Sequence, residues 1–160
     1  MLFRSRLSEI LLELLNTTPV VDGAPTDVLD DGWLAARDAG SLEDVRALRE
    51  DLQGVVRGEL DAEVLNPYLA AVRSVPTLGG GRLDWMLEGA VDWRARVVLA
   101  WGELQNDRPG RLRACANEEC HLFLLDRSRG GTGRWCSMSG CGNRMKARRH
   151  YGRTLGKAHS

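Results

Sequence analysis

Four cysteines are the residues of this 160-residue chain whose type and spacing point most directly to chemistry. Four residues separate Cys115 from Cys120, four separate Cys136 from Cys141, and fifteen lie between the two pairs. Two short loops that each offer two thiolates can surround one zinc ion tetrahedrally. The spacing therefore predicts a closed, structural Zn²⁺ site with these four cysteines as ligands.

Other uses of the cysteines stay open but are less favoured. Disulfides are disfavoured because we expect a reducing, cytoplasmic location. A catalytic zinc usually keeps one open position beside three protein ligands, and a redox pair usually has C-x-x-C spacing. His121, which directly follows Cys120, is interpreted as a residue at the surface or next to the ligands.

The spacer between the two cysteine pairs predicts a β-hairpin. Glycines at 130, 131 and 133 form a turn signal between two strand-like segments, residues 121–126 and 134–135. Such a hairpin would place Cys120 and Cys136 side by side at its open end. Gly140 and Gly142 flank the last cysteine, where the backbone must bend and approach a metal closely.

Basic residues dominate the segment after Cys141, which we expect to form a helix that starts at this last ligand. At 3.6 residues per turn, Lys146, Arg149 and Arg153 share one side of the helix, whereas Arg144 and Arg148 lie nearer the phase of Cys141. This density of charge indicates contacts with nucleic-acid phosphates. A solvated basic face that offsets the anionic zinc centre is an equally compatible interpretation. The candidate nucleic-acid-binding residues are Arg144, Lys146, Arg148, Arg149 and Arg153.

The zero net charge of the chain conceals two unlike parts. Residues 1–107 hold 10 basic and 19 acidic residues, whereas residues 108–160 hold 12 basic and 3 acidic residues. The reversal coincides with the turn signal Asp107-Arg108-Pro109-Gly110. We therefore predict a regulatory or dimerising domain over 1–107 and a zinc finger over 108–160.

Apolar periodicity predicts an α+β protein, with a mainly helical N-terminal domain and a small sheet. We expect helices over 2–15, from about residue 26, and over 42–56, 61–74 and 90–104, with a turn at 79–81 and a strand at 82–87. No apolar run approaches the roughly 20 residues that a bilayer crossing needs. We predict a cytoplasmic protein with no membrane partner.

The sequence WCSMSGCGNR at residues 135–144, together with the first cysteine pair, resembles the CGNR zinc-finger family. The sequence LLELLNT at 11–17 is similar to the motif that opens the ABATE-type domain, with Glu13 where Asp is usual. The resemblance implies a bacterial, stress-induced transcription regulator. In such a protein an ABATE-like domain over 1–107 precedes a DNA-binding, CGNR-type finger over 108–160, which holds structural zinc through the four cysteines.

Our leading hypothesis is a transcription regulator that binds nucleic acid, duplex DNA above all, through a treble-clef-like finger made of a hairpin and the basic helix. One alternative is RNA binding, with His121, Trp135 and Tyr151 stacking on bases. Another is a protein-interaction module with a purely structural finger, whose basic helix docks on an acidic surface such as that of residues 1–107. We predict no enzyme, since no catalytic constellation, open metal site or nucleotide loop is evident. A small-molecule effector of the N-terminal domain and a homodimer are further expectations.

Overall fold

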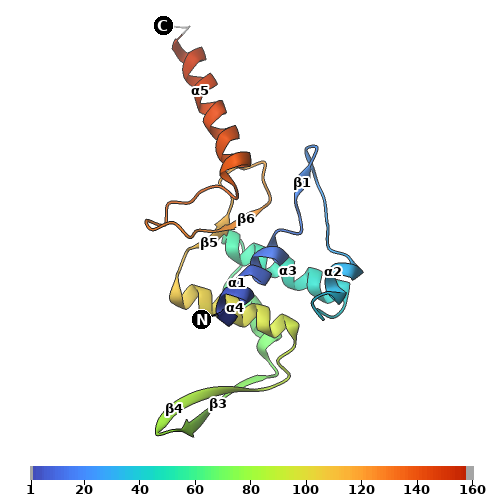
Figure 1. The fold of residues 1–160 in the computed structure, drawn as a ribbon. Helices are drawn as coiled ribbons and strands as arrows, with labels where there is room; N and C mark the ends of the chain where they lie inside the picture. Colours follow the sequence, from blue (N-terminus) through green and yellow to red (C-terminus); the bar gives the residue numbers. More distant parts are fainter. Residues whose placement is uncertain (1, 158–160) are drawn as a thin grey trace.

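The computed structural model describes residues 2–157, and side chains over residues 8–151. Helices and small antiparallel sheets are combined in one α+β structure. Figure 1 shows a helical body, from which the β3–β4 hairpin extends at one end and α5 at the other. In the part of the chain that is described, no helix is both long and apolar enough to span a bilayer.

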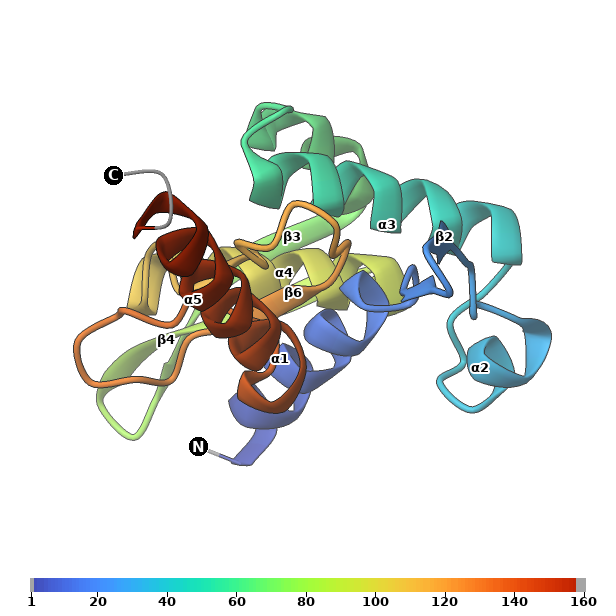
Figure 2. The same ribbon diagram turned by 90° about the horizontal axis from the view of Figure 1, so that it is seen from above.

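Four α-helices make up the body: α1 (Leu2–Leu15), α2 (Asp31–Ala35), α3 (Leu42–Arg57) and α4 (Trp93–Asp107). The predicted helices at 2–15, 42–56 and 90–104 are confirmed, whereas the short one expected from about residue 26 begins only at Asp31. Local signals set the ends of α3: the Ser41 hydroxyl accepts the Asp44 N–H, and Gly58 ends the helix at a φ of 76°. Figures 1 and 2 show α1 beside α4, with α3 along the same body.

The predicted helix over 61–74 is wrong. A 3₁₀ helix, η1 (Ala62–Leu69), is followed by strand β3 (Val72–Gly79), which pairs with β4 (Arg82–Gly89). Pro67 lies inside η1 and has no N–H to continue α-helical bonding. Gly80 and Gly81, both with positive φ, form the two-residue turn that lets the chain double back. A second small hairpin is formed by β1 (Val20–Val21) with β2 (Ala24–Pro25).

One hydrophobic core joins the helical body to the first strands of the cysteine-rich segment. Fully buried leucines of α1 and α3, such as Leu14 and Leu48, belong to the same cluster as Leu112 of β5 (Leu112–Ala114) and Phe123 of β6 (Phe123–Leu125). The two sequence ranges that meet at residue 107 thus pack together. Their division into separate domains stays a prediction.

Candidate metal centre

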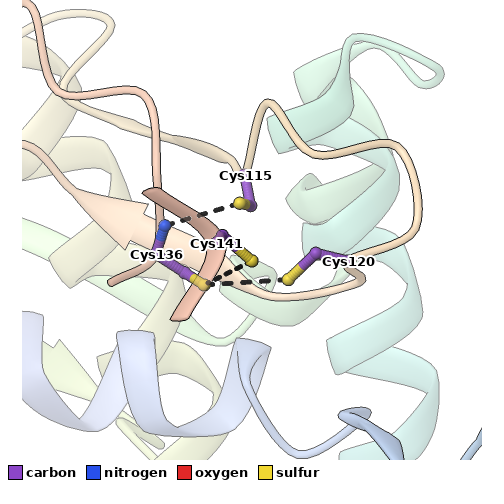
Figure 3. A group of neighbouring side chains, drawn as sticks. All are labelled: Cys115, Cys120, Cys136 and Cys141. Carbon is purple, nitrogen blue, oxygen red and sulfur yellow. Dashed lines mark hydrogen bonds between the residues drawn. The ribbon is translucent and has the colours of Figure 1, made fainter. Parts of the chain in front are cut away.

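Three short segments carry the four cysteines. The turn between β5 and β6 supplies Cys115 and Cys120, the irregular segment after residue 130 supplies Cys136, and the π-helical turn η2 (Met138–Gly142) supplies Cys141. Figure 3 shows the four side chains converging from these segments. Helix α5 (Asn143–Lys157) begins two residues after the last cysteine.

The β-hairpin predicted between residues 121–126 and 134–135 is not formed. Strand β6 lies antiparallel to β5, with Leu112 opposite Leu125, and not to residues 134–135. The Arg134 carbonyl instead accepts the N–H of Ala116 at 2.8 Å. Cys120 and Cys136 nevertheless meet as expected, because the backbone bond to Ala116 brings Cys136 to the turn between β5 and β6.

Asp126 explains why the loop after β6 turns away from that strand. Its buried carboxylate accepts the backbone N–H groups of Ser128 and Gly133, each at 2.9 Å, and pairs with Arg113 at 2.8 Å. Hydrogen bonds from Ser128, with further contributions from Gly133 and Arg113, lower the pKa of Asp126 to about 2. A Cβ on Gly133 would lie 2.7 Å from the carboxylate, so a side chain there would displace Asp126.

The distances between the thiol sulfurs fit a tetrahedral metal site. The Sγ atoms of Cys120 and Cys136 are 3.7 Å apart, as are those of Cys136 and Cys141. All four sulfurs lie within 4.8 Å of one another, and all four cysteines are free thiols. Zinc–sulfur bonds of about 2.3 Å give tetrahedron edges of about 3.8 Å. The cysteines are therefore arranged to hold a metal ion.

Side-chain and backbone N–H groups donate to the sulfurs. The Asn117 side chain, only 1% exposed, donates from Nδ2 to Cys141 Sγ at 3.4 Å. The Cys136 N–H donates to Cys115 Sγ at the same distance. Such donors orient and stabilise thiolate ligands.

Sequence reasoning missed Asn117. A second asparagine, Asn143, follows Cys141 by two residues. Asn143 is exposed and already helical, at φ −69° and ψ −39°. Asn117 is held by its own turn, since its carbonyl accepts the Cys120 N–H at 2.8 Å and its Oδ1 accepts the Glu119 N–H at 3.4 Å. The signal that could have found it is an asparagine between the first two cysteines, since asparagine side chains favour Asx turns.

Burial acts against the ionised form of the Cys120, Cys136 and Cys141 thiols. Burial raises the pKa of Cys120 and of Cys136. Burial opposes ionisation of Cys141 as well, but hydrogen bonds from Asn117 and the neighbouring thiols lower its pKa overall. Because metal ligands bind as thiolates, binding of a cation at these sulfurs is coupled to proton release.

The candidate nucleic-acid-binding residues lie on α5, and those whose side chains are described are exposed: Arg144, Lys146, Arg148 and Arg149. The helix contains no acidic residue. Arg148 forms an ion pair with Glu119 of the finger: its Nη2 lies 2.7 and 2.8 Å from the two carboxylate oxygens. The side chain of Arg153 lies outside the described residues.

A cleft of about 730 Å³ separates the metal centre from α3. Cys115 and Cys120 line one side, and Arg49 and Asp27 line the other. Arg49 is 4% exposed and forms two hydrogen bonds with the Asp27 carboxylate, at 2.7 and 3.0 Å. The hydrogen bond from Arg49 outweighs burial and lowers the pKa of Asp27 to about 2.

Residues 111–154 match the model of the CGNR zinc finger family. The matched range contains all four cysteines, β5, β6, η2 and most of α5. No curated protein is significantly similar to the chain. The resemblance of the finger to this family is thus supported, and the ABATE-type domain and the stress response stay predictions.

Proposed function

We propose that the chain is a transcription regulator that binds duplex DNA through α5 and holds one structural Zn²⁺. The proposal starts from the match of residues 111–154 to the CGNR zinc finger family. One observation supports the binding of nucleic acid. Helix α5 is fifteen residues long, has basic but no acidic side chains, and projects from the body (Figure 1). A free-standing cationic helix of this kind has the shape and charge that fit a DNA groove.

Zinc is the metal that the donor set favours. Four thiolates are soft ligands, and a tetrahedral four-sulfur set closes the coordination sphere. The bound ion would supply folding energy to a segment that has few buried apolar residues of its own. We infer a treble-clef-like arrangement, in which the β5–β6 turn supplies two ligands and η2 supplies one immediately before α5.

The basic residues divide into two roles. Arg148 forms an ion pair with Glu119 at 2.7 Å, which reduces the charge that it offers to a phosphate. Arg144, Lys146 and Arg149 are exposed along the same helix, and we assign them to the DNA phosphates. Phosphate contacts set affinity and orientation rather than sequence preference.

The proposed role assigns no catalytic reaction to the chain. A small-molecule effector stays a prediction for residues 1–107, and the 730 Å³ cleft between α3 and the finger is where we would seek it. Polar side chains from both parts of the chain, including Gln53 and Asn117, line that cleft.

Salt-dependent binding of the zinc-loaded protein to duplex DNA tests this proposal. Substitution of Arg144, Lys146 and Arg149 together by Ala should weaken binding and make the log–log salt slope shallower by about 3. Arg96→Ala, which removes one exposed arginine of α4 instead, is the control. Equal binding by the triple variant and the wild type would overturn the assignment to α5. Preference for single-stranded RNA over duplex DNA would replace the DNA target by RNA.

A further inference from the structure

The β3–β4 hairpin carries an apolar face that nothing in the described chain covers. Residues opposite one another in this ladder share a face: Leu78 with Leu83, Pro76 with Trp85, and Ser74 with Leu87. Leu78 is 82% exposed, Trp85 64% and Leu83 58%. Such side chains together expose on the order of 500 Å² of apolar surface, which typically marks an interaction site.

The hairpin is also unsupported as a structure. Figure 1 shows it extending from the body beyond α4. Its extensive contacts are those between β3 and β4 themselves. An isolated two-stranded hairpin is marginally stable at best in water. Additional strands beside it would supply the missing support.

The turn determines which backbone groups of β4 face outward. The pair that flanks a two-residue turn, here Gly79 and Arg82, is hydrogen-bonded. Bonded and non-bonded pairs then alternate, so Pro76 and Trp85 form a non-bonded pair. Pro76 agrees with this pattern because it has no N–H to donate. Trp85 therefore directs its own N–H and C=O away from β3, as Leu83 and Leu87 do.

The two edges of the hairpin differ. Proline removes one donor from the free edge of β3 and so blunts it against further pairing. The free edge of β4 has no proline and keeps a complete row of donors and acceptors. A further strand should therefore add to β4.

We propose that a second copy of this chain pairs along β4, antiparallel, with the two-fold axis at Trp85. This register places Arg82 opposite Glu88 of the second copy, twice, and Leu83 opposite Leu87 of the second copy, twice. It also sets the two Trp85 side chains beside each other on the same apolar face. Opposite charges and apolar residues that face each other across strands are stabilising.

The neighbouring registers are disfavoured by charge. A two-fold axis at Asp84 opposes that aspartate with its own copy. An axis at Met86 opposes Asp84 with Glu88 of the second copy, twice. Like charges directly opposite one another destabilise a sheet. The charge pattern of β4 therefore selects a second copy in the Trp85 register.

Charge exchange between two variants tests the register in solution, by sedimentation of the full-length zinc form without nucleic acid. Arg82→Glu and Glu88→Arg should each raise the dimer dissociation constant about tenfold, because both symmetry-related pairs become repulsive. A mixture of the two variants should associate about as tightly as the wild type, since each heterodimer restores two attractive pairs. Arg96→Gln changes an exposed charge on α4, outside the hairpin, and should leave the dimer unchanged.

Backbone pairing has its own test. Leu87→Pro removes an outward N–H and should abolish the dimer, whereas Leu87→Ala keeps this N–H and should only weaken it. Circular dichroism checks that the helical body is intact in every variant. A wild type that stays monomeric from micromolar to millimolar concentration overturns the proposal. So does a variant mixture that associates no better than its separate components.

Discussion

The side-chain amide of Asn16 forms two hydrogen bonds with the backbone of Phe123, accepting its N–H at 2.7 Å and donating to its carbonyl at 3.2 Å. These bonds join the end of α1 to the first residue of β6, 107 positions later in the chain. The adjacent Thr17 hydroxyl accepts a hydrogen bond from Arg49 of α3 at 3.0 Å. The Asn-Thr pair thus links α1 both to the finger and to α3.

Asn16→Ala should destabilise the zinc form by about 2 kcal/mol, because two hydrogen bonds are lost and the partly buried backbone groups of Phe123 lose their partners. Urea unfolding followed by circular dichroism measures the effect. Asn106→Ala, at an exposed position of α4, is the matched control and should change stability little. Equal stability of the two variants would contradict this role for Asn16.

Purified protein should contain one zinc ion per chain, and Cys141→Ser should lower this content strongly. The substitution removes the ligand that directly precedes α5 and that accepts the Asn117 hydrogen bond. Elemental analysis gives the stoichiometry, and amide NMR spectra should show loss of order in the finger after chelation. Ser139→Ala in the same turn is the control. Chelated protein with an unchanged spectrum would show that no metal supports the fold.

The Asp27–Arg49 pair should make stability fall at acid pH. The pKa of Asp27 is about 2 in the folded state and about 4 when unfolded, so the pair contributes fully above about pH 4. This contribution, about 2 kcal/mol, is lost as the pH falls from about 4 to about 2. Asp27→Asn should remove this part of the acid dependence and destabilise the protein at neutral pH, because Arg49 is left buried without a counterion.

Urea unfolding of wild type and Asp27→Asn at several pH values measures the difference between them. Acid release of a bound metal affects both proteins and therefore cancels in that difference. Asp31→Asn, at an exposed position in the first turn of α2, is the control. A difference that stays constant between about pH 2 and pH 6 would contradict the assignment.

Glu119→Gln should leave DNA affinity equal or higher, in contrast to the loss expected for the α5 triple variant. The substitution removes a negative charge beside α5 and releases Arg148 from its ion pair. The ion pair with Arg148 also holds the pKa of Glu119 below its usual range, so Glu119 is charged at neutral pH. Fluorescence anisotropy at fixed salt measures the affinity, with Glu118→Gln as control. A large loss of affinity would mean that the position of Arg148, more than its charge, matters for binding.

Local sequence patterns were sufficient for much of the fold and for the convergence of the four cysteines. The ends of α3 depend on Ser41 and Gly58, which act within one turn of the helix. The cysteine spacing predicted which residues converge, and the sulfurs do lie within 4.8 Å of one another. The helical form and exposed basic residues of α5 likewise follow from adjacent residues.

Local sequence patterns did not predict which distant segments pair with each other. The glycine-rich turn was compatible with pairing of β6 to residues 134–135. Strand β6 pairs with β5 instead, because Asp126 accepts hydrogen bonds from the backbone of the loop that follows β6. Nor did spacing reveal that Asn117 contacts a sulfur or that Asn16 holds Phe123. Helix signals and ligand spacings act over a few residues. Partners far apart along the chain are selected only when burial and hydrogen bonding are satisfied throughout the folded molecule.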